Sequence, residues 1–387
     1  MAQLRQPVWI NAEDVPPLPK GWRSLPTAEA CIQLKPGKRF DSKTVSENGS
    51  IPVLNQSETG FLGYHDEEPG VIASPKAPVV TFANHTCAMR LMKRPFSSIQ
   101  NIFPKVGKPG VTETVYFYYA TLGRVGLSDY KGHHPVFRQA YIPVPPLPIQ
   151  QCIAGILSAY DELIENSERR IKTLESMAQA LYREWFVHFR FPGHESVPRV
   201  PSPLGEIPKG WEVRLVEEMV KRIPVGKKYD QKTVASTGTV PVFDQGKSGI
   251  IGYHDDEPGV VASETAPVIV FANHTCYQRL IHIPFSTIQN VLPFVPSPVL
   301  CRDIYWLYWA TSGLVMFNDY KGHWPEFAAK TLIVPNAELC QQFGEFAAPL
   351  SLQILRLERQ IQNLRRTRDL LLPPLLSGQI DLEAIPT

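Results

Sequence analysis

The sequence lacks the short motifs that many enzymes use for catalysis or for binding a cofactor. It contains no G-x-x-x-x-G-K-[ST] phosphate loop, no G-x-G-x-x-G fingerprint, no G-x-S-x-G elbow and no H-E-x-x-H pair. No apolar run approaches the ~20 residues of a membrane span. The opening residues also hold no apolar segment of signal-peptide length. We therefore expect a cytoplasmic protein that has no catalytic site and binds no cofactor itself.

Paired cysteines and a strong net charge are also missing. The six cysteines are scattered and form no C-x-x-C pair, which argues against a zinc or redox motif. His85 with Cys87, and His274 with Cys276, supply only two ligands each, so we expect a structural turn there and no metal site. Lys and Arg number 39 against 37 Asp and Glu, a net charge of +2. This balance neither predicts nor excludes a polyanionic partner, because binding depends on charge gathered on one face.

What the sequence does contain is a long internal repeat. Residues 63–87 and 252–276 are identical at 19 of 25 aligned positions. The match begins at "PKGW" (19–22 and 208–211) and continues to "DYKGH" (129–133 and 319–323), so the shift is 189 residues and later 190. Each copy spans about 130 residues, the size of one ordinary domain. We therefore expect two similar globular heads.

Within each copy, short segments rich in Val, Ile, Phe and Tyr are separated by Gly, Pro, Asn and Asp. This pattern predicts strands joined by turns, with a few short helices, and so an α+β head. The stretch 115–127 ("VYFYYATLGRVGL") and its match 304–316 fit either a buried strand or a buried helix, because periodicity does not separate the two.

A long helix is predicted after each head. From Ile149 and again from Leu339, apolar residues recur at alternating spacings of four and three, which is a heptad seam. Each helix spans ~35 residues, or ~50 Å. An apolar stripe of this length needs a partner, and the simplest one is the other helix, in a two-stranded coiled coil with pseudo-twofold symmetry. Pro373 and Pro374 are expected to end the second helix.

We accordingly predict five segments along the chain. They are a first globular head (1–148), a central helical region (149–190), a proline-rich linker (191–209), a second globular head (210–338) and a C-terminal helical region (339–387).

Two similar heads held by long helices suit a target that itself has two parts, such as two half-sites on duplex DNA. Cations neutralise phosphates, and amides or long cations read base edges. The candidates in the first head are Lys38, Arg39, Lys43, Asn55, Gln56, Lys131 and His133. Those in the second are Lys227, Lys228, Lys232, Asp244, Gln245, Lys247, Lys321 and His323. Each also has a plainer interpretation, since lysine clusters are commonly solvated and amides in glycine-containing loops commonly serve the turn.

The order of these segments resembles the specificity (S) subunits of type I restriction-modification systems. The resemblance is carried by "GEIPKGWEV" (205–213), the repeated "FANHTC", the helix "LIENSERRIKTLESMAQALYREWFVHFR" (163–190) and "RDLLLPPLLSGQIDL" (368–382). It implies that each head reads one half of a bipartite DNA site and that two antiparallel helices set the gap. It also implies two methyltransferase (modification) subunits that bind S-adenosylmethionine, a third subunit type with restriction and translocase activities, and no catalysis by this chain.

On this resemblance, the exposed faces of the helices are candidate contacts for the modification subunits. They include Arg169, Arg170, Trp185 and Arg365. The two heads are more alike than the halves of such subunits often are, so we expect similar half-sites that approach an interrupted palindrome.

Two alternatives to DNA recognition stay open. One is a tandem-repeat adaptor that binds proteins and not DNA. The other is an endonuclease that uses the carboxylates of "HDEEPG" (65–70), although an acidic turn closed by Pro and Gly explains that segment more simply.

Overall fold

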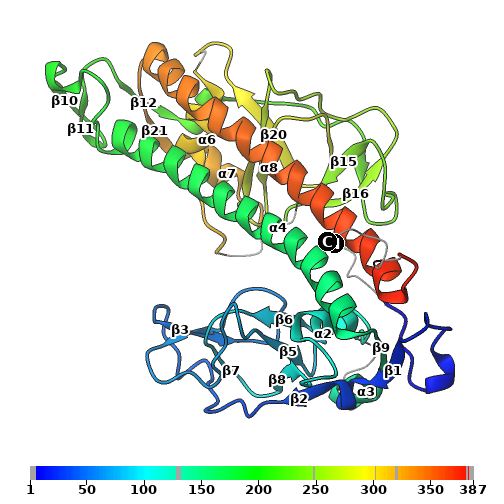
Figure 1. The fold of residues 1–387 in the computed structure, drawn as a ribbon. Helices are drawn as coiled ribbons and strands as arrows, with labels where there is room; N and C mark the ends of the chain where they lie inside the picture. Colours follow the sequence, from blue (N-terminus) through cyan, green and yellow to red (C-terminus); the bar gives the residue numbers. More distant parts are fainter. Residues whose placement is uncertain are drawn as a thin grey trace. The chain divides into compact units, whose positions relative to one another are not determined.

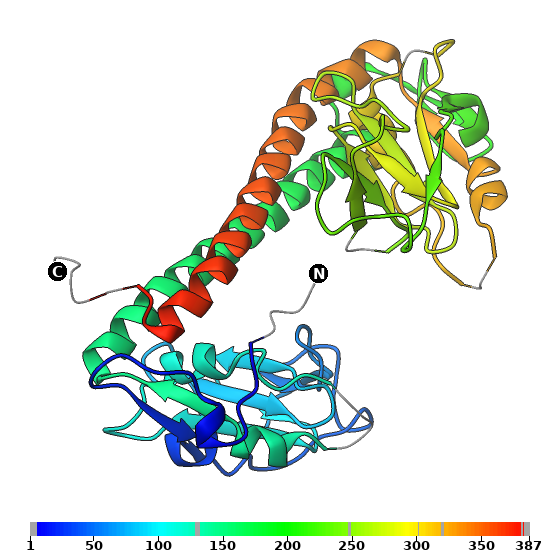
Figure 2. The ribbon, with the colours of Figure 1, turned by 90° about the vertical axis from the view of Figure 1, so that its right-hand side faces the viewer.

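The computed structural model describes residues 6–127, 132–246, 249–300, 302–318, 321–380 and 382. The chain forms two compact units, unit 1 (1–166 and 360–387) and unit 2 (167–359). Each unit contains one head and one part of each of the two long helices, α4 (Leu147–Tyr182) and α8 (Ala337–Ser377), as Figures 1 and 2 show. Within the described residues, no helix is long and apolar enough to cross a membrane.

The head of unit 1 is built on two small sheets. An antiparallel sheet has the order β2 (Cys31–Gln33), β8 (Ile102–Gly107), β5 (Val79–Ala83), β6 (Met89–Met92). A second sheet has the order β4 (Gly63–His65), β3 (Ile51–Leu54), β7 (Ser97–Ser98), in which β3 and β7 are parallel. β1 (Arg23–Pro26) pairs with β9 (Tyr141–Val144). The short helices are η1 (Ala12–Asp14), α1 (Thr27–Ala30), α2 (Thr114–Thr121) and α3 (His134–Gln139).

The head of unit 2 repeats this plan. One sheet has the order β13 (Val220–Arg222), β20 (Val291–Pro296), β17 (Val268–Ala272), β18 (Gln278–Ile281). The other has the order β14 (Lys228–Tyr229), β19 (Ser286–Ile288), β15 (Val240–Phe243), β16 (Ile250–His254). β12 (Glu212–Leu215) pairs with β21 (Thr331–Val334), and the short helices are α5 (Val216–Met219), α6 (Ile304–Thr311) and α7 (Trp324–Ala328). The expectation of two similar α+β heads is confirmed.

The aromatic stretch that fitted either a strand or a helix is a helix in both heads. α2 packs on β5, β6 and β8, and α6 packs on β17 and β20. The side chain of Glu113 caps α2 by accepting from the Tyr116 N–H, and Asp303 caps α6 by accepting from two backbone N–H groups. Both helices carry apolar residues all around because they lie in the core of the head.

The long helices pair in antiparallel fashion. In unit 1, Arg368 of α8 binds Asp161 of α4. In unit 2, Trp185 just beyond α4 packs against Phe343, with ring centroids 6.2 Å apart. Residue numbers thus fall along α8 as they rise along α4. The predicted seam is buried at Ile153, Leu157, Ile164, Ala178, Ala347, Leu357 and Ile361. The antiparallel coiled coil is therefore confirmed.

Two local expectations are wrong. The second long helix does not end at Pro373 and Pro374 but continues to Ser377. The reason is that Leu375 and Leu376 are buried in the core of unit 1, and their burial offsets the backbone hydrogen bonds that proline removes. The segment 191–209 is not an open linker, because it contains η3 (His194–Ser196) and a hairpin of β10 (Arg199–Ser202) and β11 (Gly205–Pro208). Phe191 and Ile207 of this segment are buried in the core of unit 2. The segment follows the π-helical turn η2 (Arg183–Val187) in the chain.

Candidate nucleic-acid interface

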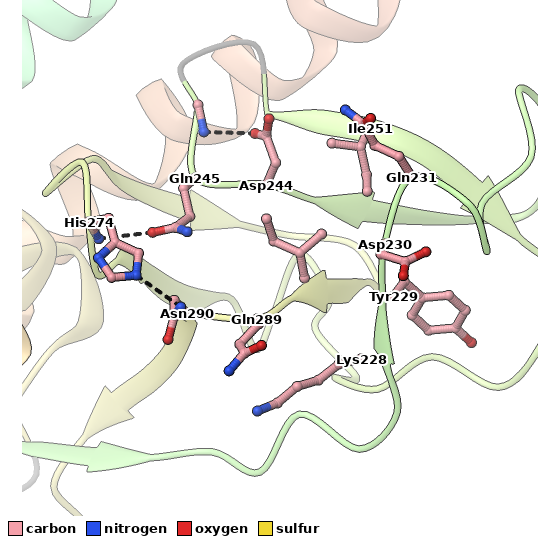
Figure 3. A pocket seen from close by; sticks show the side chains of 12 residues that line it. Lys228, Tyr229, Asp230, Gln231, Asp244, Gln245, Ile251, His274, Gln289 and Asn290 are labelled. Atoms are coloured by element: carbon pink, nitrogen blue, oxygen red, sulfur yellow. Dashed lines mark hydrogen bonds between the residues drawn. The ribbon is translucent and has the colours of Figure 1, made fainter. Parts of the chain in front are cut away.

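Three parallel strand segments end at one edge of the second sheet in unit 2. Both β14 and β15 pair in parallel with β19. The carboxyl ends of parallel strands lie at the same edge, so residues 228–231, 244–246 and 288–290 come together there. We call these residues the carboxyl edge of unit 2. They form a hollow of about 620 Å³ together with Ile251 and His274 (Figure 3).

The hollow is rich in amide side chains, and these differ in whether they are already bonded. Gln245 Oε1 accepts from the His274 N–H at 2.9 Å, and Asn290 Nδ2 lies 2.9 Å from His274 Nε2. In contrast, no hydrogen bond or ion pair to the described residues is formed by the side chains of Lys228, Gln231 and Gln289. Figure 3 accordingly shows dashed lines at Gln245 and Asn290 and none at these three residues. Two amides and one ammonium group are thus available to a ligand.

The acidic groups of the hollow are engaged with their own loops. Asp244 Oδ1 accepts from the Gly246 N–H at 2.9 Å. Asp230 Oδ1 accepts from the backbone N–H groups of Lys232 and Thr233, at 2.9 and 3.0 Å. These carboxylates therefore shape the turns that follow β14 and β15.

A buried histidine and serine hold the carboxyl edge in place. His254 Nε2 lies 2.9 Å from Ser286 Oγ, which also accepts from the Gly259 N–H at 2.9 Å. Tyr229 stacks on His254 with ring centroids 4.1 Å apart. Because Ser286 and Tyr229 belong to β19 and β14, this cluster ties two of the three strands to the loop that follows β16.

Unit 1 contains an equivalent edge, formed by residues that lie 189 positions earlier in the sequence. His65 Nε2 lies 2.9 Å from Ser97 Oγ, and Phe40 stacks on His65 at 4.1 Å. The parallel register is also the same, since Val53 pairs with Ser97 as Val242 pairs with Ser286. The carboxyl edge of unit 1 consists of residues 39–42, 55–57 and 99–101. Of the twelve lining positions, six are identical in the two heads and six differ.

The predicted DNA-binding residues fall into several groups. Asp244, Gln245 and Lys228 lie in the hollow, and Asn55 and Gln56 occupy the equivalent loop of unit 1. Lys43 and Lys232 are exposed in the turns after the first strands. Lys38 forms an exposed ion pair with Glu67 at 2.6 Å, and Lys227 forms one with Asp256 at 2.7 Å. Exposed pairs of this kind are weak and can be exchanged for a phosphate.

Two of these candidates are buried, and a third is bonded within its own head. His133 and His323 are 4% and 0% exposed, because their rings lie inside the heads at the start of α3 and α7. Arg39 is turned inward, where its Nη1 donates to Ser98 Oγ at 2.6 Å and to the Ile99 carbonyl at 2.9 Å. Arg39 therefore holds its loop against the neighbouring strand segment.

The remaining candidates are Lys131, Lys247 and Lys321. Lys131 and Lys247 lie outside the described residues. Lys321 is exposed, and its carbonyl oxygen lies 2.9 Å from His274 Nδ1. This contact brings the backbone at Lys321 next to a residue that lines the hollow.

Among the candidate partner contacts, Arg169 and Arg170 are exposed on α4, and Arg365 is half-buried on α8. Trp185 does not belong to an exposed face. It is 7% exposed, packs against Phe186 and Phe343 in the core of unit 2, and also contacts the exposed ring of Phe346. Burying its large apolar ring between the helices is more favourable in free energy than exposing the ring to water.

The acidic turn "HDEEPG" is a structural element. Asp66 Oδ1 accepts hydrogen bonds at 2.9 Å from both the backbone N–H and the hydroxyl of Ser50. These bonds lower the pKa of the Asp66 carboxyl below its usual value. In the part of the chain that the structure describes, no group of His, Cys, Asp and Glu is arranged to hold a metal ion.

The segment "NHTC" forms a turn at the end of β5 and again at the end of β17. Cys87 and Cys276 both have φ of 58°, so they close the turns in the left-handed region. Both cysteines are half-buried. Burial of the Cys87 thiol raises its pKa to about 11.

Sequence reasoning missed Gln231, Gln289 and Asn290. The available signal for Gln289 and Asn290 was "IQN", which lies at the end of β19 and directly after β7. Its meaning depends on the parallel pairing of β14 and β15 with β19, a strand that is distant from both in the sequence and carries no local sign of this pairing.

Comparisons with known proteins agree with this architecture. Residues 19–176 match the family model described as type I restriction modification DNA specificity domain. The chain is 26% identical over 330 residues to the type I restriction enzyme MjaIX specificity subunit of Methanocaldococcus jannaschii, covering 76% of this chain and 75% of that protein. It is 27% identical over 162 residues to the EcoR124I/EcoR124II specificity subunit of Escherichia coli, covering 40% and 36%.

The fold is similar to the crystal structure of the type I restriction-modification S subunit from M. genitalium. The TM-score is 0.57 at 16% identity, with 92% of this chain and 96% of that chain covered. This likeness concerns the fold. The family model and the curated relatives to which the chain is similar all describe specificity subunits, or the DNA specificity domain, of type I restriction-modification systems.

Proposed function

We propose that this chain is the DNA-recognition subunit of a type I restriction-modification complex, and that each head reads one half of a bipartite site. The observation that carries the proposal is the carboxyl edge, which occurs once in each head. In unit 2 it presents the unbonded amides of Gln231 and Gln289 beside the ammonium group of Lys228. Amides of this kind form paired hydrogen bonds with adenine in the major groove.

Lysines next to the edge suit the phosphate backbone. Lys43 and Lys232 are exposed beside the edge, and Lys38 and Lys227 are held only by exposed ion pairs. Phosphate contacts supply affinity and position, and the amides then supply specificity. On this proposal the net charge of +2 is misleading, because the relevant charge lies close to the two edges.

The helices would set the gap between the half-sites. α4 has 36 residues and α8 has 41, which correspond to about 54 and 62 Å at ~1.5 Å per residue. Exposed positions such as Arg169 and Arg170 would receive two modification subunits. Those subunits would bind S-adenosylmethionine and transfer the methyl group, restriction and translocase subunits would join them, and this chain would contribute no catalytic group.

The two half-sites should be related. Two heads with the same fold and half of their edge residues in common read similar groups of bases. An antiparallel pair of similar helices is related by a twofold rotation, so the complete site would approach an interrupted palindrome.

The test is to co-express the chain with its modification subunits, to measure duplex retention as salt is raised, and to map methyladenine across the host genome. We expect one bipartite motif that disappears when this chain is omitted, with DNA affinity that falls steeply with salt. A complex that captures the methyltransferase but retains no duplex even at low salt would identify a protein adaptor. Cleavage of DNA by the isolated chain with magnesium would contradict a non-catalytic role.

A further inference from the structure

We infer that Gln231 in unit 2, which is replaced by Ser42 in unit 1, makes the two half-sites differ at one base, whereas Gln289 and Gln100 read a base that both half-sites share. The inference rests on the proposed function and adds which side chains discriminate. It follows from which edge residues differ between the heads and which of them are free to bind.

The backbone at the edge is the same in both heads. The histidine–serine bond is 2.9 Å in each, and the parallel strand register is identical. Asn101 and Asn290 follow the shared strand with φ of 63° and 66°, so the turn that carries Gln100 and Gln289 is also the same. A difference in base preference must therefore come from side chains.

Most of the side chains that differ are already engaged. Asn55 Oδ1 accepts from the Ser57 N–H at 3.1 Å and from Arg90 Nη2 at 3.0 Å, while Asp244 accepts from the Gly246 N–H. Phe40 and Tyr229 are stacked on histidines. These pairs shape the loops and are not available for base contacts.

The pair Arg39 and Lys228 differs in another way. The half-buried Arg39 donates to Ser98 Oγ and to the Ile99 carbonyl, whereas the Lys228 ammonium group is exposed and unbonded within the described chain. A single flexible cation at the rim suits a phosphate oxygen. Lys228 would therefore add affinity in unit 2 without selecting a base.

Two further pairs offer no free polar group, because Ser57 donates to Asn55 Oδ1 at 2.6 Å where unit 2 has Gly246, and Leu62 and Ile251 are both apolar. Gln231 and Ser42 therefore remain as the discriminating pair. Both are exposed at equivalent positions after the first strand of the edge. The glutamine amide offers a donor and an acceptor and can bond adenine at N6 and N7 together, whereas a serine hydroxyl is shorter and is far less selective. Loss of one such paired contact reduces discrimination by roughly tenfold to a hundredfold.

The shared reader is Gln289 with its counterpart Gln100. In unit 2 the register of β14 and β15 on β19 places Gln289 between the segments that carry Asp230 and Gln245, so it lies centrally in the edge. Both glutamines are exposed, and neither side chain forms a hydrogen bond within the described residues.

The experiment maps methyladenine genome-wide in cells that express the modification subunits with the wild-type chain or with one variant. We expect Gln231→Ser to relax one position of one half-site by at least about tenfold, leaving the gap and the other half-site unchanged. The reciprocal Ser42→Gln should sharpen or change the other half-site only. Gln289→Ala and Gln100→Ala should relax corresponding positions, one in each half-site.

Two controls separate base reading from general effects. Lys228→Ala should reduce the salt dependence of duplex binding by about one phosphate contact and leave the motif unchanged. Glu257→Gln, an exposed substitution in the acidic turn outside the hollow, should change neither. Capture of the modification subunits by each variant reports correct folding.

The inference is overturned if Gln231→Ser and Ser42→Gln, both assembled normally, leave the motif as it is or alter the same half-site. It is also overturned if Lys228→Ala changes a base preference. These outcomes differ from failure of the proposed function, in which the wild-type chain itself would direct no bipartite motif.

Discussion

Lys105 is buried and has no carboxylate partner among the described residues, so replacing it should stabilise unit 1. Its side chain is 2% exposed on β8, where Nζ lies 3.1 Å from Gln33 Oε1 and 3.0 Å from His134 Nε2. Burial lowers the pKa of this ammonium group, because a charge in the core loses its hydration. At the equivalent position unit 2 has Phe294, which packs against Trp324.

The size of the effect follows from these partners. Lys105→Met removes the cost of burying a charge, while Gln33 and His134 are exposed enough to bond water instead. A net gain of about 1–2 kcal/mol is expected, by comparison with buried ion pairs that are replaced with apolar residues. In a unit of roughly 190 residues this raises the melting temperature by about 2–8 °C.

The pH dependence of the stability of unit 1 gives a second way to measure the effect of the buried Lys105. Burial, followed by the charges of Lys105 and Arg138, lowers the pKa of His134 from 6.5 to about 4. Between these values the unfolded chain binds more protons than the folded chain, so unit 1 loses stability as pH falls from 6.5 to 4. Lys105→Met removes one of the causes, and this loss should therefore become smaller.

Hydrogen exchange measured by mass spectrometry on the full chain reports the stability of each unit separately. Peptides of β5 and β8 report on unit 1, and peptides of β17 and β20 report on unit 2. Lys105→Met should slow exchange in unit 1 only. The matched variant Phe294→Lys should cost unit 2 at least about 3 kcal/mol, because it removes a packed ring and buries a charge. A less stable Lys105→Met, or a tolerated Phe294→Lys, would refute the reasoning.

The remaining predictions concern the long helices and their surroundings. Asp161→Ser should destabilise unit 1 by about 1–2 kcal/mol, because Arg368 keeps only Asp369 as a carboxylate partner and the Tyr119 hydroxyl loses its acceptor; a double-mutant cycle with Arg368→Ala in urea unfolding should show coupling above ~0.5 kcal/mol. Trp185→Ala should cost unit 2 about 3–5 kcal/mol in the same assay, and a cost under ~1 kcal/mol would mean that the ring is not part of the core. Arg169→Glu combined with Arg170→Glu should weaken capture of the modification subunits while helix content by circular dichroism stays constant; full capture would exclude this face of α4 as their docking surface.

Features that repeat at a regular spacing were predictable from the sequence. The heptad seam correctly predicted burial at Ile153, Leu157, Leu357 and Ile361, because helix geometry converts spacing directly into a face. Internal repetition likewise predicted two heads of one fold. The failures came where tertiary packing overrides a local rule, as at Pro373 and Pro374, which remain helical because the leucines after them are buried.

The candidate site was less predictable, because residue type does not determine exposure. Arg39 and Lys43 stand four positions apart and were assigned the same role, yet Arg39 bonds the interior and Lys43 faces solvent. Lys105 shows the same point, since it is a lysine of the core. The amides that matter most, Gln231 and Gln289, meet only through parallel strand pairing between distant segments.

The residues that hold the strands of each head together are buried, whereas the residues expected to contact bases are exposed at the carboxyl edge. This difference determines how base recognition can change. Buried groups such as His254 and Ser286 hold the strands of each head in place. The strand register is the same in both heads even though the core has lysine at position 105 and phenylalanine at the equivalent position 294. Gln231 and Ser42 are exposed, and substitutions at such positions usually alter stability by no more than about 0.5 kcal/mol. A contact with a base, in contrast, is worth about 1–3 kcal/mol of discrimination. Substitutions at the carboxyl edge therefore change which bases are preferred far more than they change folding, so one head can acquire a new half-site while the helices and the other head stay as they are.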